Sequence, residues 1–156
     1  MRLLFVFISM SVLGFGQNYF QQEVNYTIDV QLNDESHVLS GFESFDYTNN
    51  SPDDLSFIYI HLWPNAYEDN KTAMSLQQYR NGNKVMENNS DEDKGCIDSL
   101  DFKVNGESVE LLFNLNHRDI GKIILKQPLK SGQTITISTP FKVNLPNGNI
   151  SRLGHV

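Results

Sequence analysis

The chain has 156 residues, of which 39% are hydrophobic and 11% aromatic, enough for one domain with a buried core. Its formal net charge is -7 at pH 7, and a surface of that sign repels nucleic acid and anionic membranes. These numbers argue against nucleic-acid binding as a function. Cys96 is the only cysteine, so the chain cannot form an internal disulfide.

The N-terminus has the layout of a secretory signal. One arginine precedes an apolar run from Leu3 to Phe15, which is too short to span a bilayer. Gly14 and Gly16 stand where signal peptidase requires small side chains, so we predict a signal peptide over residues 1–16 and a mature N-terminus at Gln17. The alternative is a buried core strand. The signal predicts export to the periplasm or the extracellular space, and no cysteine stands directly after the run to carry a lipid anchor.

Alternating apolar and polar residues predict an antiparallel hairpin after this segment. From Val24 to Leu32 five apolar residues alternate with four polar ones, and we expect the apolar ones to share one face of a half-buried strand. A polar turn follows, and the segment from His37 to Tyr47 returns in the same style. The segment from Leu55 to Trp63 is apolar on both faces, which predicts a central strand. Its interior residues should be Ile58, Ile60 and Leu62.

The rest of the chain is predicted to add one short helix and further strands. Pro64 ends the third strand, and Lys71 to Tyr79 carries apolar residues at helical spacing. Asn81 to Gly95 is polar and acidic, which indicates an exposed loop. Four more strands are expected, at residues 97–104, 108–115, 122–125 and 134–145. The expected fold is all-β, an antiparallel sandwich or saddle-shaped sheet with one short helix.

Residues for catalysis or metal binding do not form a recognisable motif. A zinc hydrolase needs an H-E-x-x-H pattern, which places two histidines on one face of a helix, and this chain has no such run. The histidines are scattered, and we expect His61 to be satisfied in or near the core. They are His37, His61, His117 and His155. No serine or cysteine nucleophile motif occurs either. The expected catalytic, cofactor-binding and metal-binding residues are therefore none.

Two segments leave a binding role open. The acidic residues 91–93, with Gly95 and Asp98, could supply oxygen ligands for calcium, but Phe102 stands where an EF-hand requires glutamate, which favours a solvated loop. Three aromatic residues around the end of the third strand could stack on sugars, although packing in the core is the commoner role. These are Tyr59, Trp63 and Tyr67.

Three segments occur in a characteristic order between Tyr19 and Val156. Leu39-Ser40-Gly41 precedes a strand, His61-Leu62-Trp63-Pro64-Asn65-Ala66-Tyr67 ends one, and Pro128-Leu129-Lys130-Ser131-Gly132-Gln133 leads into the strand from Thr134 to Phe141. In this order the segments resemble the first domain of zinc metallopeptidases related to aminopeptidase N and leukotriene hydrolase, the gluzincins. The resemblance implies that residues 17–156 form an N-terminal β domain that caps an active site, and that the domain is truncated at its C-terminal end.

The same resemblance implies a parent enzyme that is an exported, zinc-dependent metallo-aminopeptidase and removes N-terminal residues from peptides. Its zinc would lie in a catalytic domain of the same polypeptide, so this chain alone should bind no zinc and be inactive. Met86-Glu87-Asn88 imitates the family's Gly-x-Met-Glu-Asn substrate strand, but Lys84 stands in place of the glycine. The expected partners are the catalytic domain and the peptide substrate. The segment from Pro140 to His155 is expected to border the face that the catalytic domain covers.

The alternative is a self-contained, secreted β-sandwich that binds carbohydrate or protein. An exposed face of tyrosine and tryptophan would favour this module. A scaffold or adhesin domain is also compatible with the composition.

Overall fold

The structure is a computed structural model that describes residues 19–156, so the predicted signal peptide lies outside the described residues. Two antiparallel sheets make up most of it. The larger sheet has the order β1-β2-β9-β5-β6, and β4 also pairs with β9. Its strands are β1 (Glu23–Asn33), β2 (Val38–Thr48), β4 (Cys96–Asp98), β5 (Lys103–Val104), β6 (Glu107–Ser108) and β9 (Thr134–Asn144). The predicted all-β class with antiparallel sheets is confirmed.

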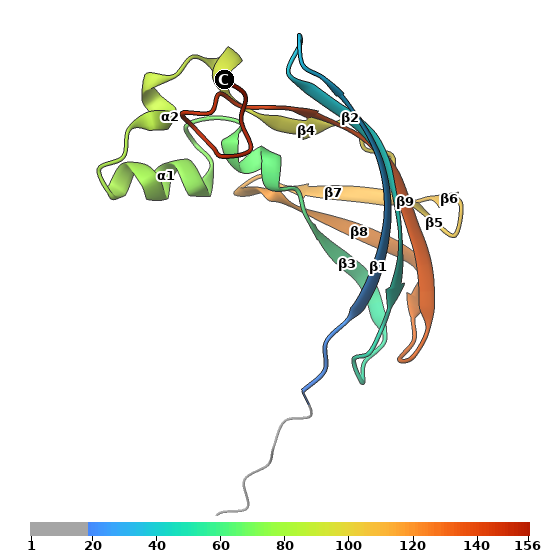
Figure 1. Cartoon of the computed structure of the whole chain (residues 1–156). Coiled ribbons are helices and arrows are strands. Elements are labelled where there is room, and N and C mark those ends of the chain that lie inside the picture. Colours follow the sequence, from blue (N-terminus) through green and yellow to red (C-terminus); the bar gives the residue numbers. More distant parts are fainter. Residues whose placement is uncertain (1–18) are drawn as a thin grey trace, which may run out of the picture.

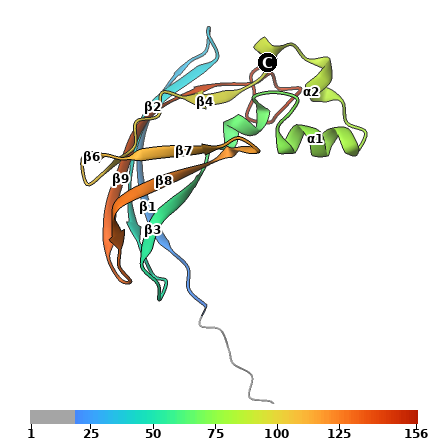
Figure 2. The same cartoon turned by 180° about the vertical axis from the view of Figure 1, so that it is seen from behind.

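The smaller sheet lies inside the curve of the larger one (Figure 1). It has the order β3-β8-β7, with β3 at Leu55–His61, β7 at Glu110–Asn114 and β8 at His117–Leu129. The view from behind shows the same nesting, with the long strands β1, β2 and β9 as a bent outer wall (Figure 2). The molecule is therefore a strongly curved sandwich that is open on its concave side.

The hydrophobic core lies between the two sheets. Its buried members come from both, because inward side chains of two facing sheets interdigitate. They are Phe45, Ile58, Phe102, Ile123, Leu125, Leu129 and Ile137. Ile58 and Leu62 are buried, at 5% and 3% exposure, and Ile60 packs partly against the core. The predicted interior side of the third strand is confirmed.

The first strand departs from the prediction of half-burial. Every residue from Asn25 to Asn33 is exposed, including four inward apolar ones. These four, which we call the β1 stripe, are Tyr26, Ile28, Val30 and Leu32, and they are 51–58% exposed. The period of two identified the shared face correctly, but β1 is the edge strand, and the smaller sheet packs against other strands of the wall.

The third strand is also not central, although the sequence predicted a central strand. β3 is an edge strand of the smaller sheet, and β8 lies in the middle between β3 and β7. Tyr59 is 64% exposed, so β3 is not apolar and buried on both faces. The apolar residues on the outer face of β3 therefore form an exposed surface patch and not a second buried layer.

The segment between the third and fourth strands contains more helix than expected. The predicted short helix is α1 (Ala73–Arg80), whose N-cap Thr72 accepts a hydrogen bond from the Ser75 amide. The 3-10 helix η1 (Trp63–Tyr67) precedes it, and α2 (Val85–Asn88) and the 3-10 helix η2 (Asp91–Asp93) follow. Met86 is only 3% exposed, so residues 81–95 are not simply an exposed loop. Neither α-helix of the described part is long and apolar enough to cross a membrane.

The C-terminal segment is packed more fully than predicted. Val143 and Ile150 are 8% and 7% exposed, and the amide of Leu145 donates to the carbonyl of His37 at 2.9 Å. The amide of His155 donates to the carbonyl of Pro146, which closes a turn on itself. Leu153 in the same segment is 49% exposed, so the apolar residues between positions 140 and 155 are only partly covered. That this segment borders the face that a catalytic domain covers stays a prediction.

Candidate functional site

The histidines do not assemble into a metal site in the described part of the chain. No group of three His, Cys, Asp or Glu side chains able to hold a metal ion occurs among residues 19–156. His37 and His155, distant in sequence, stack with ring centroids 3.6 Å apart. His61 is exposed and lies 3.1 Å from a carboxylate oxygen of Asp119, so the expected position in or near the core is wrong. Its alternation with Ile60 and Leu62 turns it outward.

The acidic loop uses its carboxylates locally. Asp91 pairs with Lys94 at 2.6 Å, and this contact lowers the pKa of Asp91. Asp93 accepts hydrogen bonds from the hydroxyl and amide of Ser90, which lower the pKa of Asp93. Asp93 thus caps the short helix η2, whereas Asp91 bonds the side chain of Lys94. Met86 and its two successors lie on α2 and not on a strand, which removes their likeness to a substrate-binding strand.

An aromatic surface covers the side of the smaller sheet that faces away from the larger sheet. We call it the aromatic face. Its ring residues are Phe57, Tyr59, His61 and Trp63. The Phe57 and Tyr59 rings meet edge to face at 5.2 Å, and the His61 and Trp63 rings lie 4.1 Å apart. Lys122 on β8 places its ammonium 3.8 Å from the Phe57 ring centroid, a cation–π contact.

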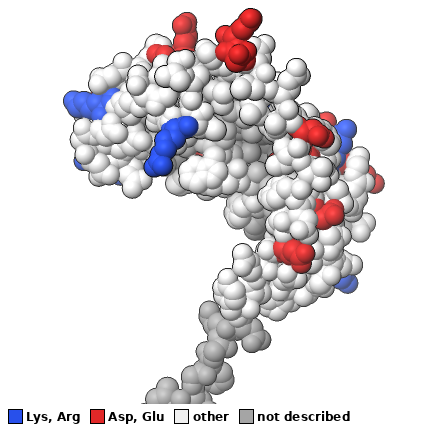
Figure 3. Space-filling view, in the orientation of Figure 1, with Lys and Arg blue, Asp and Glu red and all other residues white. Residues whose placement is uncertain are grey.

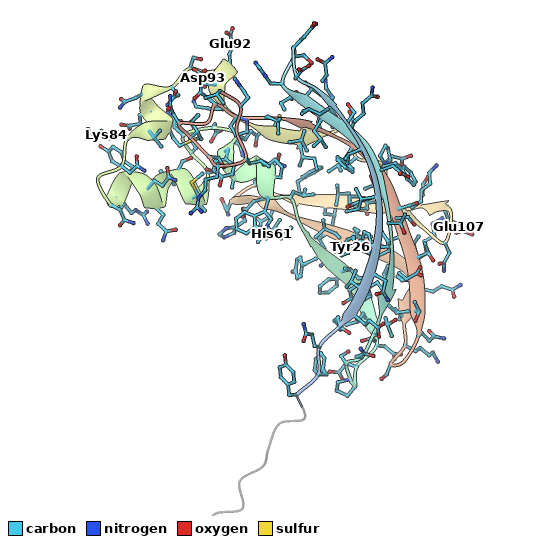
Figure 4. The ribbon with its side chains drawn as sticks, in the orientation of Figure 1. Tyr26, His61, Lys84, Glu92, Asp93 and Glu107 are labelled. Atoms are coloured by element: carbon cyan, nitrogen blue, oxygen red, sulfur yellow. The ribbon has the colours of Figure 1, made fainter. Side chains whose placement is uncertain are left out.

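The aromatic face is open to solvent. Tyr59 is 64% and Trp63 59% exposed, whereas Tyr67 is half-buried and does not join them. Figure 4 shows His61 on the concave side of the molecule, between α1 and the long wall. Much of the hollow in this view is free of charged side chains (Figure 3). Two of the three aromatic residues singled out in the sequence therefore lie on one exposed surface, and such a surface is suited to contact another molecule.

A second apolar surface on the concave side includes one carboxyl group. Glu43 on β2 lies in register between Ile28 of β1 and Thr139 of β9, on the same side as the β1 stripe. Burial raises the pKa of Glu43, because it disfavours the charged form. Burial and the nearby Glu43 also raise the pKa of Tyr26. Sequence reasoning missed Glu43, although it is the one acidic residue at an inward position of β2.

Replacing Glu43 with glutamine should stabilise the folded chain at pH 7 and not at low pH. A carboxyl group whose pKa is raised by folding destabilises the folded state when ionised, and this cost disappears below the unfolded pKa of about 4.5. The gain should stay below about 1 kcal/mol, because solvent screens a half-exposed group. Urea unfolding at pH 7 and at about pH 4 measures it. Asp29→Asn, on the outer side of β1, is the control. A gain that persists at low pH would contradict the assignment.

A groove separates β4 from β7, and we call it the β4–β7 groove. Its volume is about 700 Å³, and it is lined by residues 96–102 on one side and mainly by Val109, Leu111, Phe113, Asn114 and Leu115 on the other. Four charged residues line it: Glu68, Asp98, Asp101 and Arg118. The Arg118 guanidinium donates to Glu68 at 3.2 Å and to Asp69 at 2.9 Å, and both contacts raise the pKa of Arg118.

Leu39-Ser40-Gly41 lies on β2, which pairs with β1 on one side and with β9 on the other. A side chain at Gly41 would have its Cβ 2.5 Å from the carbonyl oxygen of Asp29 and 2.6 Å from the Phe141 ring. Only glycine fits between β1 and this ring. The glycine of the first ordered sequence element is therefore required by the packing of the large sheet.

The other two ordered elements join the sheets. Asn65, 7% exposed, donates from its side chain to the carbonyl of Arg118 on β8 and accepts from the Ile97 amide on β4. Residues 128–133 form the end of β8 and the turn into β9, where Gly132 adopts a φ of 77°. Two of the three elements thus connect parts of the sandwich, and the third, with Gly41, lies within the larger sheet between β1 and β9.

A comparison with protein families and one with curated proteins found no match. Solved structures of M1 zinc metallopeptidases show a partial structural likeness to this chain. The enzyme from Deinococcus radiodurans, and a mutant of it, each share 13% identity over 80% of this chain, with TM-scores of 0.48 and 0.49. A two-domain M1 zinc metallopeptidase mutant bound to L-tryptophan shares 14% identity over 83% of this chain, with a TM-score of 0.49.

The present chain spans about a fifth of the length of these proteins, 20–22% of each. Identity and TM-score are both low, so the likeness does not by itself assign a function to this chain.

Proposed function

We propose that this chain is the non-catalytic N-terminal domain of an exported zinc metallo-aminopeptidase of the aminopeptidase N and leukotriene hydrolase type. In this role it caps the active site of a catalytic domain in the same polypeptide. The zinc belongs to that catalytic domain, and the substrates are peptides that lose their N-terminal residues. The predicted signal peptide supports export of the whole enzyme.

The observation that carries the proposal is the position of the three ordered sequence elements. Each has a defined packing role: Gly41 lies beneath the Phe141 ring, Asn65 between the two sheets, and Gly132 in the turn between β8 and β9. An unrelated sandwich does not need these three sequence elements in this order, because each element satisfies a packing requirement of this curved arrangement. The elements therefore support a common architecture rather than isolated chance likenesses.

The aromatic face and the β1 stripe support the same proposal. Large apolar side chains on a single domain are normally covered when they gather on one surface. Here Tyr59, Trp63 and the four residues of the β1 stripe are each at least half exposed. A domain that packs against a second domain of the same polypeptide has such surfaces, and the neighbour shields them from water.

The experiment is to express the reading frame through any region encoded after Val156, with and without residues 19–156. We expect the longer product to contain an H-E-x-x-H motif, bind zinc and hydrolyse leucine p-nitroanilide in a chelator-sensitive way. The chain of 156 residues alone should show no such turnover. A reading frame without that motif would overturn the proposal.

A hydrophobic dye tests whether the aromatic face is the covered surface. The isolated chain should bind the dye, and Tyr59→Ser with Trp63→Ser should remove much of the signal. Tyr79→Ser is the matched control, because Tyr79 is 48% exposed on α1 and lies off the aromatic face. In the longer product the dye signal should be lost without any substitution.

The second candidate function is a carbohydrate-binding module, and one observation favours it. Tyr59 and Trp63 are both exposed on the aromatic face, and sugar rings bind to exposed aromatic rings. Saturable binding of oligosaccharides by the isolated chain, lost in the Trp63→Ser variant, would support this function. Dye binding without oligosaccharide binding would support the capping domain.

A further inference from the structure

We propose that the β4–β7 groove binds an extended peptide as an added strand on β7, with apolar side chains at alternate positions and a basic residue at one end. This inference does not rest on the proposed peptidase role, because it concerns only contacts within the described chain.

The shape of the groove follows from the way the two sheets separate. Both cartoon views show β4 above β7 (Figures 1 and 2), and residues of both strands line the groove. The amide of Val109 donates to the carbonyl of Phe102 at 3.1 Å, which ties the two walls together at one end. A volume of about 700 Å³ lies within the range of roughly 300–1,000 Å³ typical of ligand sites. The groove therefore has room for a ligand larger than a few water molecules.

The groove offers apolar contacts in a row. Leu111, Phe113 and Leu115 lie at alternate positions of the β7 region, and the last two are 55% and 87% exposed. Ile97 and Leu100 line the opposite wall. A strand has the same period of two, so its alternate side chains can enter a groove of this kind in register. The apolar walls and the strand period together favour an extended chain.

The hydrogen-bonding groups available to a peptide are on β7. Among the described residues, β7 has β8 as its only strand partner, so its other edge carries unpaired amide and carbonyl groups. On the opposite wall, the amide of Ile97 is already bonded to the side chain of Asn65. An open edge beside apolar pockets is the arrangement by which proteins bind peptides through strand addition.

The charge of the groove lining favours a positively charged group at one end of the peptide. Three carboxylates and one guanidinium line the groove, and Arg118 is already paired with two carboxylates. Asp98 accepts a hydrogen bond from the Ser99 hydroxyl and has no cationic partner among the ion pairs of the described residues. The net charge of the lining is negative, which attracts a lysine, an arginine or a free amino terminus.

The test uses a fluorescein-labelled hexapeptide, Lys-Val-Thr-Val-Thr-Val, titrated with the full chain while fluorescence anisotropy is measured. Two versions carry N-methyl groups on alternate residues, on the second and fourth in one and on the third and fifth in the other. An added strand has one bonded edge, so one version should bind at least about tenfold more weakly and the other should change little. Equal binding of both versions, or no saturable binding of the unmodified peptide, would overturn the proposal.

Two variants on the same strand locate the binding site. Phe113→Ser should weaken binding about tenfold or more, since a large apolar contact is lost. Leu112→Ser is the matched control, because Leu112 is 43% exposed and points to the aromatic face. It should change the affinity less than about twofold. An equal effect of the two variants, or a larger effect of Leu112→Ser, would place the peptide elsewhere and overturn the assignment.

A third arm tests the charge and the class of ligand. Asp98→Asn should weaken the lysine peptide several-fold and leave unchanged a peptide with glutamate in place of lysine. Myristate added as a competitor should not displace the peptide. Displacement by the fatty acid, or tighter binding of the glutamate peptide, would show that the groove accepts another kind of ligand.

Discussion

Ile58→Ala should lower the free energy of unfolding by about 2–5 kcal/mol, the range for deletion of a buried aliphatic side chain that leaves a cavity. Ile58 is 5% exposed and belongs to the core between the two sheets, where Phe45, Ile123 and Ile137 are also buried. Chemical denaturation measures the change as a lower midpoint at unchanged slope. Leu62→Ala, at 3% exposure, should have an effect in the same range.

Tyr59→Ala is the control for this prediction. Tyr59 is the next residue on β3, but its side chain is 64% exposed on the opposite face. Its removal should cost less than about 1 kcal/mol, because little of the ring leaves water on folding. A loss for Tyr59→Ala equal to that for Ile58→Ala would show that the aromatic face is buried in the folded chain.

Asn49→Ala should destabilise the fold by roughly 2–4 kcal/mol, because several buried groups lose their partners at once. The Asn49 side chain is fully buried, and its amide donates to the carbonyls of Asp53 and Leu129 at 2.8 and 3.0 Å. Its carbonyl oxygen accepts from the amide and the hydroxyl of Ser51. Thermal or urea unfolding measures the loss.

Asn50→Ala is the control. It distinguishes the loss of the buried hydrogen bonds of Asn49 from the effect of removing any asparagine side chain from this turn. Asn50 is the next residue, is exposed, and donates from its side chain to the carbonyl of Gln21 at 3.0 Å. The variant should lose less than about 1 kcal/mol, since water can replace the exposed bond. If Asn49→Ala were no more harmful than Asn50→Ala, the buried hydrogen bonds of Asn49 would not contribute to stability as expected.

Much of the local structure could be predicted, because local structure depends on neighbours in the sequence. The alternation from Val24 to Leu32 predicted β1 and the residues that share its face, and the register with β2 agrees. The helical spacing from Lys71 to Tyr79 predicted α1. Asn105 and Gly106 adopt the positive φ values that a tight hairpin turn requires.

Part of the candidate surface could also be predicted. Tyr59 and Trp63 were recognised as possible contact residues, but Tyr67 does not share their surface. The β4–β7 groove was missed, because its walls come from segments separated by a turn and by β5 and β6. One signal was present: Leu111, Phe113 and Leu115 place apolar side chains at every second position, although Leu112 between them is apolar as well.

The sequence by itself determined the first strands, the last strand and the short helix, since each follows from a period of two or 3.6 residues. The strand expected at residues 97–104 is divided into β4 and β5, and the one expected at residues 122–125 is the much longer β8. Only the tertiary structure decided which apolar sides are covered. β1 lies at the edge of the larger sheet, so the β1 stripe stays exposed, and the side of β3 that carries the aromatic face is exposed as well. Asn49, a turn-forming residue in sequence, is buried at the end of β2 and bonds to Leu129 on β8. Burial depends on pairing between distant segments, and no local pattern contains that information.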